Sequence, residues 1–190
     1  MRFLKRIMVF ASGGGGNFQA LCDEFQGSLI SINALVVDRN CGAMGIAKSR
    51  SIPIFRLDFS NSDSNVIVQL KNLPKCDLIA LCGFNRVLPG EFLDSIDIPI
   101  LNTHPSLLPS YGGAGMIGVK VQEAVKQNND EYAGCTIHFV DSGIDTGRHI
   151  IQCRILVDKK ESAWELGGRI HQLETKLYPL AIKTVLSGIK

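Results

Sequence analysis

The sequence lacks both a long apolar run and a large excess of charge of one sign. Its 20 Lys and Arg residues stand against 18 Asp and Glu residues, which leaves a formal net charge of +2 at pH 7. This balance gives neither the basic surface of a nucleic-acid-binding protein nor a polybasic membrane patch. No stretch approaches the ~20 apolar residues of a membrane-spanning helix. These absences predict a soluble protein without a nucleic-acid or membrane partner.

Cysteine is present, but without the spacing of a metal site. The six cysteines include no Cys-x-x-Cys pair and no histidine at a zinc-ligand spacing. Arg2, Lys5 and Arg6 precede an apolar run at residues 7–11. That run is shorter than a signal-peptide core and leads into glycines without a cleavage pattern. We therefore expect a cytoplasmic protein with reduced thiols and no metal, in which residues 7–11 form the first strand.

The glycine-rich stretch that follows lacks the residues of two common nucleotide-binding motifs. A dinucleotide fingerprint that began with Gly13 and Gly15 would need a third glycine at position 18, where the chain has Phe18. A Walker loop needs a lysine, and this stretch has none. An apolar run, four glycines and a helical segment still predict an anion site, because unpaired N–H groups and the helix dipole favour phosphate. A monophosphate is the predicted ligand; a tight turn without a ligand is the alternative.

Apolar runs alternate with helical spacing along the first two thirds of the chain. At 190 residues we expect a single domain. The alternation predicts an α/β fold with a doubly wound, mostly parallel sheet. Strands are predicted at residues 7–11, 30–37, 53–55, 78–82 and 100–104, and helices at residues 17–22, 44–50, 66–73 and 116–127.

The last third of the chain predicts a different arrangement. Residues 135–140 and 148–157 alternate as an antiparallel strand pair, joined by a tight loop. Residues 163–186 follow as a terminal helix whose apolar residues recur at helical spacing. We expect this stripe to pack in the core; it consists of Leu166, Ile170, Leu173, Leu177 and Leu180.

Asn102 and His104 end the strand predicted at residues 100–104. Side chains two residues apart on a strand point to the same face. The pair would lie at the carboxyl end of a strand, where open parallel sheets place their ligands. An amide can donate to a developing oxyanion, and an imidazole can donate or accept a proton near neutral pH. The alternative is a core histidine that caps a loop.

The sequence from Asn102 to Pro109, Asn-Thr-His-Pro-Ser-Leu-Leu-Pro, followed by Tyr111 and a glycine, resembles the signature of the 10-formyltetrahydrofolate-dependent formyltransferases. The resemblance covers nearly the whole chain. It is strongest to members that formylate glycinamide ribonucleotide (GAR) in purine synthesis. It includes the glycine-rich loop, residues 83–88, and His138-Phe139-Val140 followed by Asp145 and Gly147.

The resemblance assigns functional residues within one formyltransferase domain. Its phosphate-binding half would be residues 1–100 and its catalytic and folate-binding half residues 101–190, in a monomer or homodimer. Catalysis would fall to Asn102, His104 and Asp145. The GAR phosphate would contact Gly15, Gly16 and Asn17, and the GAR amine would contact Glu174. Folate would contact Asn85, Arg86, Val87, Leu88, Asn102, Asp141, Ser142, Gly143, Ile144 and Asp145. His138 is expected to pack within its strand pair.

The implied reaction transfers a formyl group from 10-formyltetrahydrofolate, a co-substrate, to a primary amine. The chain departs from the family pattern at Gly115, Ile117 and Gly118, where several members carry histidines or an arginine. The glycine-rich loop of residues 110–116 predicts a mobile lid over the substrate. The alternatives are a formyltransferase for another small amine, such as a sugar nucleotide, and a non-catalytic folate-binding module. A tRNA formyltransferase is not expected, because the chain has neither the length nor the basic surface.

Overall fold

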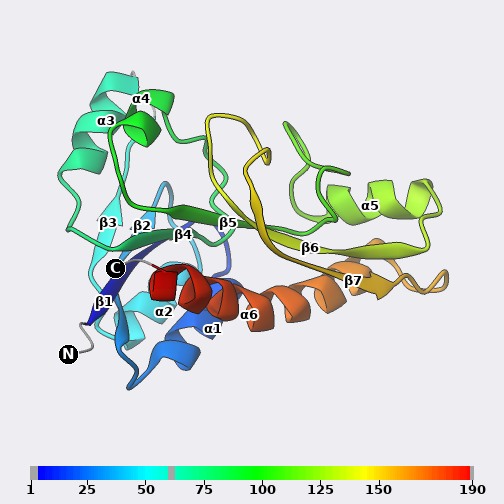
Figure 1. Ribbon diagram of the computed structural model, residues 1–190. Coiled ribbons are helices and arrows are strands. Elements are labelled where there is room, and N and C mark those ends of the chain that lie inside the picture. Colours follow the sequence, from blue (N-terminus) through cyan, green and yellow to red (C-terminus); the bar gives the residue numbers. More distant parts are fainter. Residues whose placement is uncertain (1–3, 60–62, 189–190) are drawn as a thin grey trace. The chain divides into compact units, whose positions relative to one another are not determined.

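A computed structural model describes residues 4–59 and 63–188 (Figure 1). The chain divides into two compact units. Unit 1 runs to Leu101 and takes in the end of the chain from Leu186, and unit 2 is Asn102–Val185. The described strands follow the order β3-β2-β1-β4-β5-β6-β7. The predicted fold class, a mostly parallel α/β sheet with an antiparallel C-terminal pair and a terminal helix, is confirmed.

Unit 1 is built from parallel strands joined by helices. β1 pairs in parallel with both β2 and β4, and β2 pairs in parallel with β3. Helix α1 contacts α2, and α3 contacts α4; Figure 1 shows the first pair and the second pair on different sides of these strands. This is the doubly wound arrangement. The elements are β1 (Lys5–Ala11), α1 (Gly16–Phe25), β2 (Ile30–Val37), α2 (Ala43–Ser49), β3 (Ile54–Arg56), α3 (Asp63–Lys71), β4 (Leu78–Leu81) and α4 (Gly90–Asp94).

The strand order reverses at β1, which lies between β2 and β4. Residues Ile7–Ala11 and Leu78–Leu81 are buried on both faces, as their unbroken apolar sequences predict. In open α/β sheets, ligands bind outside the carboxyl ends of the strands where the order reverses. The two loops that follow these ends are residues 12–15 and 82–89. The fold of unit 1 therefore places both glycine-containing loops at the expected ligand position.

Unit 2 contains the antiparallel pair and the long terminal helix. β5 (Ile100–His104) enters it from unit 1, and α5 (Val119–Gln127), β6 (Tyr132–Phe139), β7 (His149–Leu156) and α6 (Ala163–Gly188) follow. β6 and β7 pair antiparallel, from Tyr132 opposite Leu156 to His138 opposite His149. Gly147 is required at this hairpin, because a Cβ atom there would lie 1.7 Å from the Phe139 carbonyl oxygen.

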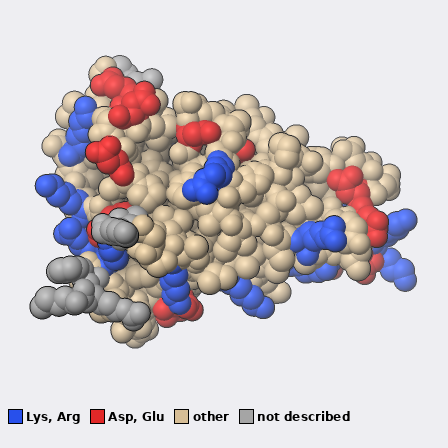
Figure 2. Space-filling view, viewed as in Figure 1, with Lys and Arg blue, Asp and Glu red and all other residues tan. Residues whose placement is uncertain are grey.

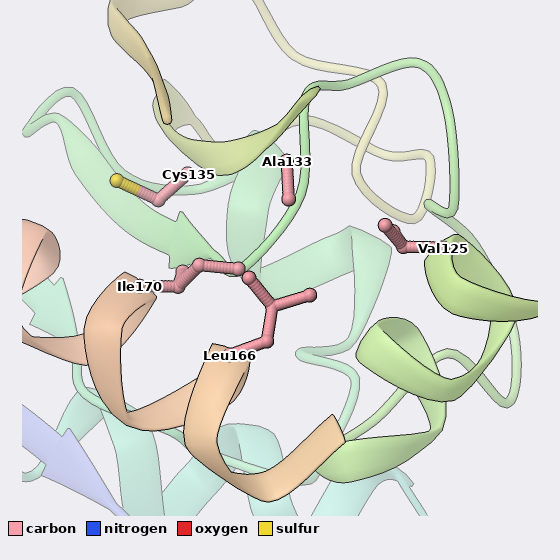
Figure 3. Close-up of a cluster of buried hydrophobic side chains, with 5 residues drawn as sticks. All are labelled: Val125, Ala133, Cys135, Leu166 and Ile170. Carbon is pink, nitrogen blue, oxygen red and sulfur yellow. The ribbon is translucent and has the colours of Figure 1, made fainter. Parts of the chain in front are cut away.

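The core of unit 2 forms where α6 packs on β6 and α5. Leu166 and Ile170 point toward Cys135, Ala133 and Val125 (Figure 3), and all five side chains are buried. The predicted stripe is confirmed at Leu166 and Ile170, and Leu173 and Leu177 pack partly buried against the cluster.

Leu180 was wrongly predicted to be in that core. Its side chain is 52% exposed, and Tyr178, Ala181 and Ile182 are buried in that part of the helix. The reason is geometric: a helix turns 100° per residue, so a strict three-and-four spacing drifts around its axis over several turns.

Two boundaries differ from the predictions because glycines hold non-helical backbone. Helix α5 begins at Val119 rather than at position 116, since Gly118 has φ +61° and ends the non-helical segment. Helix α1 begins at Gly16 rather than at position 17, and Gly15, with φ +88°, is its N-cap. The short helix α4 was not predicted, because its five residues are fewer than a periodic pattern needs.

The surface carries charges of both signs. On the face in Figure 2, acidic and basic side chains occur in small groups among neutral residues, in keeping with the net charge of +2. Within the described residues, none of the helices has the length and apolarity to cross a bilayer. The same residues contain no cluster of three or more His, Cys, Asp or Glu side chains placed to hold a metal ion.

Candidate active site

The carboxyl end of β5 and the loop between β6 and β7 bring three predicted residues together in unit 2. His104 Nδ1 lies 3.4 Å from Asp145 Oδ2, and both side chains are mostly buried. Asn102 lies two residues before His104 on β5 and points to the same face. The structure therefore gathers the amide, the imidazole and the carboxylate that the sequence singled out.

His138 joins this group, although the sequence was interpreted as giving it only a packing role. Its Nε2 lies 3.3 Å from Asn102 Nδ2 and 3.7 Å from Asp145 Oδ1. The side chain is 2% exposed, and burial lowers its pKa below the ordinary value. A neutral ring can accept a hydrogen bond from the Asn102 amide through Nε2, while Nδ1–H donates to the Phe139 carbonyl at 2.8 Å. This pairing orients the Asn102 amide.

A signal for His138 was available in the sequence. His138 lies on the strand that leads directly into the loop of Asp145, and Thr136 and His138 share a strand face by alternation. Both are buried polar residues, which is uncommon on the core face of a sheet. Two buried polar residues at strand spacing, beside a catalytic candidate, indicate a polar network rather than packing alone.

Each nitrogen of the His104 ring faces an acceptor. Nε2 lies 2.8 Å from the Tyr111 carbonyl oxygen, and Nδ1 faces the Asp145 carboxylate. The imidazolium can donate from both nitrogens, whereas a neutral ring can donate from only one. The ring is therefore held between the Asp145 carboxylate and the Tyr111 carbonyl group.

The loop that carries Asp145 contains the other predicted folate contacts. Asp141 accepts hydrogen bonds from Gly143 N at 3.1 Å and from Thr146 Oγ1 at 2.6 Å, so it holds the loop in shape. Residues 141–144 are exposed. Asp145 alone turns inward, at 11% side-chain exposure and with φ +59°. Asp141 therefore stabilises the turn, whereas Asp145 faces His104.

Glu174 is buried in α6 and lies against β5. Thr103 Oγ1 donates to Glu174 Oε1 at 2.8 Å, and His171 Nδ1 lies 3.3 Å from Oε2. The hydrogen bond to Glu174 raises the pKa of His171 above its ordinary value. Because side chains alternate along a strand, Thr103 and hence Glu174 occupy the opposite face of β5 from Asn102 and His104. Glu174 is therefore not part of the Asn102, His104 and Asp145 group.

Unit 1 presents the glycine loop at the N-terminus of α1. Gly15 is confined by α2, since a Cβ atom there would lie 2.9 Å from Ala43 Cα and Ile46 Cδ1. Gly13 and Gly14 face open space. Asn17 is buried in the first turn of α1. The loop thus combines glycines that face open space with the N–H groups of a helix start, which suits an anion.

A buried carboxylate that the sequence analysis missed ties the second loop of unit 1 to the first. Asp38 follows β2, and its Oδ2 accepts from Arg39 Nη2 at 2.7 Å and from Arg86 Nε at 3.0 Å. Burial acts to raise the Asp38 pKa, but hydrogen bonds from Arg39, Ser12 and Arg86 outweigh it and lower the pKa to about 2. Arg86 also lies over the Phe59 ring, 5.5 Å from its centroid.

Ser12 completes this link. The Asn85 N–H donates to Ser12 Oγ at 2.9 Å, and the Ser12 N–H donates to the Gly83 carbonyl at 3.1 Å. The start of the glycine loop and the loop after β4 therefore hold each other in place. Of the predicted folate contacts in the second loop, Asn85, Arg86 and Val87 are exposed and Leu88 is buried.

Comparison with known proteins adds an independent finding. The formyl transferase family model matches residues 5–182. A phosphoribosylglycinamide formyltransferase of Bacillus subtilis is 34% identical, over 96% of this chain and 95% of that protein. A chloroplastic phosphoribosylglycinamide formyltransferase of Arabidopsis thaliana is 32% identical over 92% of this chain. This chain spans 63% of that plant protein and 58% of its Vigna unguiculata counterpart.

A solved structure agrees with these sequence matches. The crystal structure of glycinamide ribonucleotide transformylase 1 from Symbiobacterium toebii superposes with a TM-score of 0.88 at 30% identity. The match covers 97% of this chain and 89% of that one.

Proposed function

The chain belongs to the formyl transferase family, and from this premise we propose that it transfers a formyl group from 10-formyltetrahydrofolate to the primary amine of GAR. The observation that carries the proposal is the grouping of Asn102, His104 and Asp145, with His104 Nδ1 3.4 Å from the Asp145 carboxylate. Relatives that carry the GAR formyltransferase name support the choice of acceptor.

The first step is attack of the amine nitrogen of GAR on the formyl carbon. A carbon–nitrogen bond forms, and the electron pair of the carbonyl bond moves to the formyl oxygen. The Asn102 amide donates a hydrogen bond to this oxyanion. The positive charge of the His104 imidazolium, whose two N–H groups face Asp145 and the Tyr111 carbonyl oxygen, stabilises the oxyanion electrostatically. Loss of one such donor costs roughly 3 kcal/mol of transition-state stabilisation.

The second step moves one proton and breaks the bond to the folate. The attacking amine has become an ammonium and gives up a proton, and N10 of the folate takes one up as it leaves with the bonding electron pair. Asp145 and His104 carry this proton, directly or through a water molecule. The products are formyl-GAR and tetrahydrofolate. The sequence supplies no nucleophile motif, so the mechanism uses no covalent enzyme intermediate.

Each substrate has a proposed set of contacts. The backbone of Gly15 and Gly16 with the Asn17 side chain binds the GAR phosphate at the start of α1. Glu174, which lies on the other face of β5 from His104, is not assigned to the reacting amine. The backbone of residues 85–88 and the turn of residues 141–145 bind the folate. Arg86 contacts the glutamate tail with the donors that Asp38 leaves available.

All six cysteines lie within the described residues and are free thiols, which supports a reducing compartment such as the cytoplasm.

The test is absorbance-monitored formyl transfer from 10-formyltetrahydrofolate, with GAR or water alone as the acceptor. We expect turnover that requires GAR and falls at least a hundredfold in His104→Ala. His149→Ala is the matched control, because His149 is exposed on β7, and it should retain turnover.

Other outcomes contradict the proposal in different ways. Turnover without GAR would identify a hydrolase. Turnover only with an amino sugar nucleotide would replace the acceptor, and the absence of turnover with every amine, alongside folate binding, would identify a binding module.

A further inference from the structure

Tyr111, which the signature contains but to which the reaction assigns no role, adopts an unusual backbone conformation. Its φ is +56°, in the left-handed region that a residue with a side chain adopts only at a cost in free energy. Asp145 has φ +59°. These are the two residues that contact the two nitrogens of His104. Backbone strain on both sides of one imidazole indicates that the surrounding structure holds these two contacts in place.

The Tyr111 side chain supplies the anchor for its own strained backbone. The phenol donates to Asp130 Oδ2 at 2.6 Å and accepts from Asn128 Nδ2 at 2.7 Å. Both partners lie in the connection between α5 and β6. Burial raises the pKa of the phenol, and Asp130 raises it further against the opposing effect of the Asn128 hydrogen bond, so the hydroxyl keeps its proton and remains a donor. This side chain therefore fixes where the Tyr111 carbonyl group lies.

The two residues after Tyr111 contact Asp145 through their backbone. The Gly113 N–H donates to Asp145 Oδ2 at 3.0 Å, the oxygen that faces His104. Gly112 lies so close that a Cβ atom there would be 2.6 Å from Leu108 Cδ2 and 3.3 Å from Asp145 Cβ. The segment Tyr111–Gly113 thus contacts both members of the His104 and Asp145 pair through its backbone.

We infer that Tyr111 is a positioning residue: anchored through its phenol to Asp130 and Asn128, it holds its carbonyl group on His104 Nε2 and thereby sets the orientation of the His104 ring toward Asp145. The inference rests on the proposed function for its effect on turnover. A carbonyl acceptor on one ring nitrogen fixes the ring plane and the position of that proton. Without the anchor, the carbonyl group moves away and the ring rotates between conformations.

The test uses variants that remove or restore the anchor. Tyr111→Phe deletes only the hydroxyl group, and Asp130→Leu removes its acceptor. Asp130→Asn keeps an oxygen that can accept from the phenol and serves as the conservative rescue. Tyr132→Phe is the matched control, because Tyr132 lies on β6, where its ring stacks with Arg154 at 4.6 Å.

Two readouts separate positioning from a general structural role. The first is the kcat against KM split in GAR formylation. We expect kcat of Tyr111→Phe and Asp130→Leu to fall about tenfold to a hundredfold with KM within about twofold, since small misplacements of a catalytic group cost this much. The second is the set of NMR signals from the His104 ring, those of its nitrogens and of its carbon-bound protons, recorded without substrates. They are assigned by their absence in His104→Gln.

We expect the His104 ring signals to shift in Tyr111→Phe and Asp130→Leu and to stay unchanged in Asp130→Asn and Tyr132→Phe. Unchanged His104 signals in Tyr111→Phe overturn the inference, whatever the turnover. Shifted signals with an unchanged kcat overturn the link to catalysis. A wild-type protein that fails to formylate GAR would refute the proposed acceptor, and the ring signals would still decide whether Tyr111 positions His104.

Discussion

At the scale of single residues, we expect a small chemical change at Asp145 to lower the rate of formyl transfer strongly. Its carboxylate faces His104 Nδ1 and accepts from the Gly113 N–H. Asp145→Asn removes the charge and the proton-accepting ability but keeps an oxygen that can accept from Gly113. We expect kcat for formyl transfer to fall about 10²- to 10⁴-fold, the usual range for general acid–base catalysis, with little change in KM.

The control for this variant is Asp94→Asn, an exposed residue of α4 in unit 1, which should leave both constants unchanged. Single-turnover kinetics with GAR measure the chemical step directly. Near-normal turnover of Asp145→Asn would show that the proton moves without this carboxylate.

Residue identity alone did not reveal every member of the candidate site. Asn102, His104 and Asp145 were predictable because their types match the chemistry and their sequence matches a known signature. Asp38 was not, because an aspartate after a strand is usually a turn former, and its two guanidinium partners are one and 48 residues away. Tyr111 was missed for the same reason, because its role depends on contacts with residues that the sequence does not place beside it. His138 was missed although its alternation with Thr136 gave a signal.

At the scale of elements, the glycine loop and α1 make the sharpest prediction. Gly15 has φ +88° and no room for a Cβ atom beside Ala43 and Ile46. Gly15→Ala should therefore shift the start of α1 and raise KM for GAR at least tenfold, with a smaller effect on KM for the folate. Steady-state kinetics with each substrate varied in turn measure the two constants.

Gly45→Ala is the control for the loop variant. Gly45 lies exposed inside α2, and a Cβ atom there meets nothing within 4 Å. Alanine should stabilise this helix by about 0.5–1 kcal/mol and leave both KM values unchanged. An unchanged KM for GAR in Gly15→Ala would contradict the assignment of a phosphate to this loop.

Element predictions from the sequence held where local patterns decide the structure. The buried strands and the terminal helix have runs or periods that few other structures satisfy. Predictions were wrong where backbone geometry decides. Gly118, with positive φ, makes α5 begin later than predicted. In α6, the side chain of Leu180 is exposed and that of Tyr178 is buried. Such effects depend on packing partners that are distant in the sequence.

At the scale of the whole molecule, the lowered pKa of Asp38 predicts how the free energy of unfolding depends on pH at the acidic end. Its carboxyl group has a pKa of about 2 in the folded protein and 3.8 as the ordinary value. A lowered pKa means that the folded state holds the charged form more tightly, so Asp38 contributes stability that is present above about pH 4. That contribution shrinks as the pH falls from 3.8 toward 2, because Asp38 takes up a proton in the unfolded chain over this range while it stays charged in the folded protein.

The difference in unfolding free energy between wild type and Asp38→Asn isolates this effect. His138 has a lowered pKa, so it destabilises both proteins equally as the pH falls below its ordinary value of 6.5, and its effect cancels in the difference. His171, with a raised pKa, cancels in the same way. Urea unfolding at a series of pH values should give a constant difference between pH 5 and 7 that diminishes between about pH 4 and 2. A difference that stays constant down to pH 2 would mean that the two arginines do not stabilise the Asp38 charge, and the link between the two loops of unit 1 would then rest on Ser12 alone.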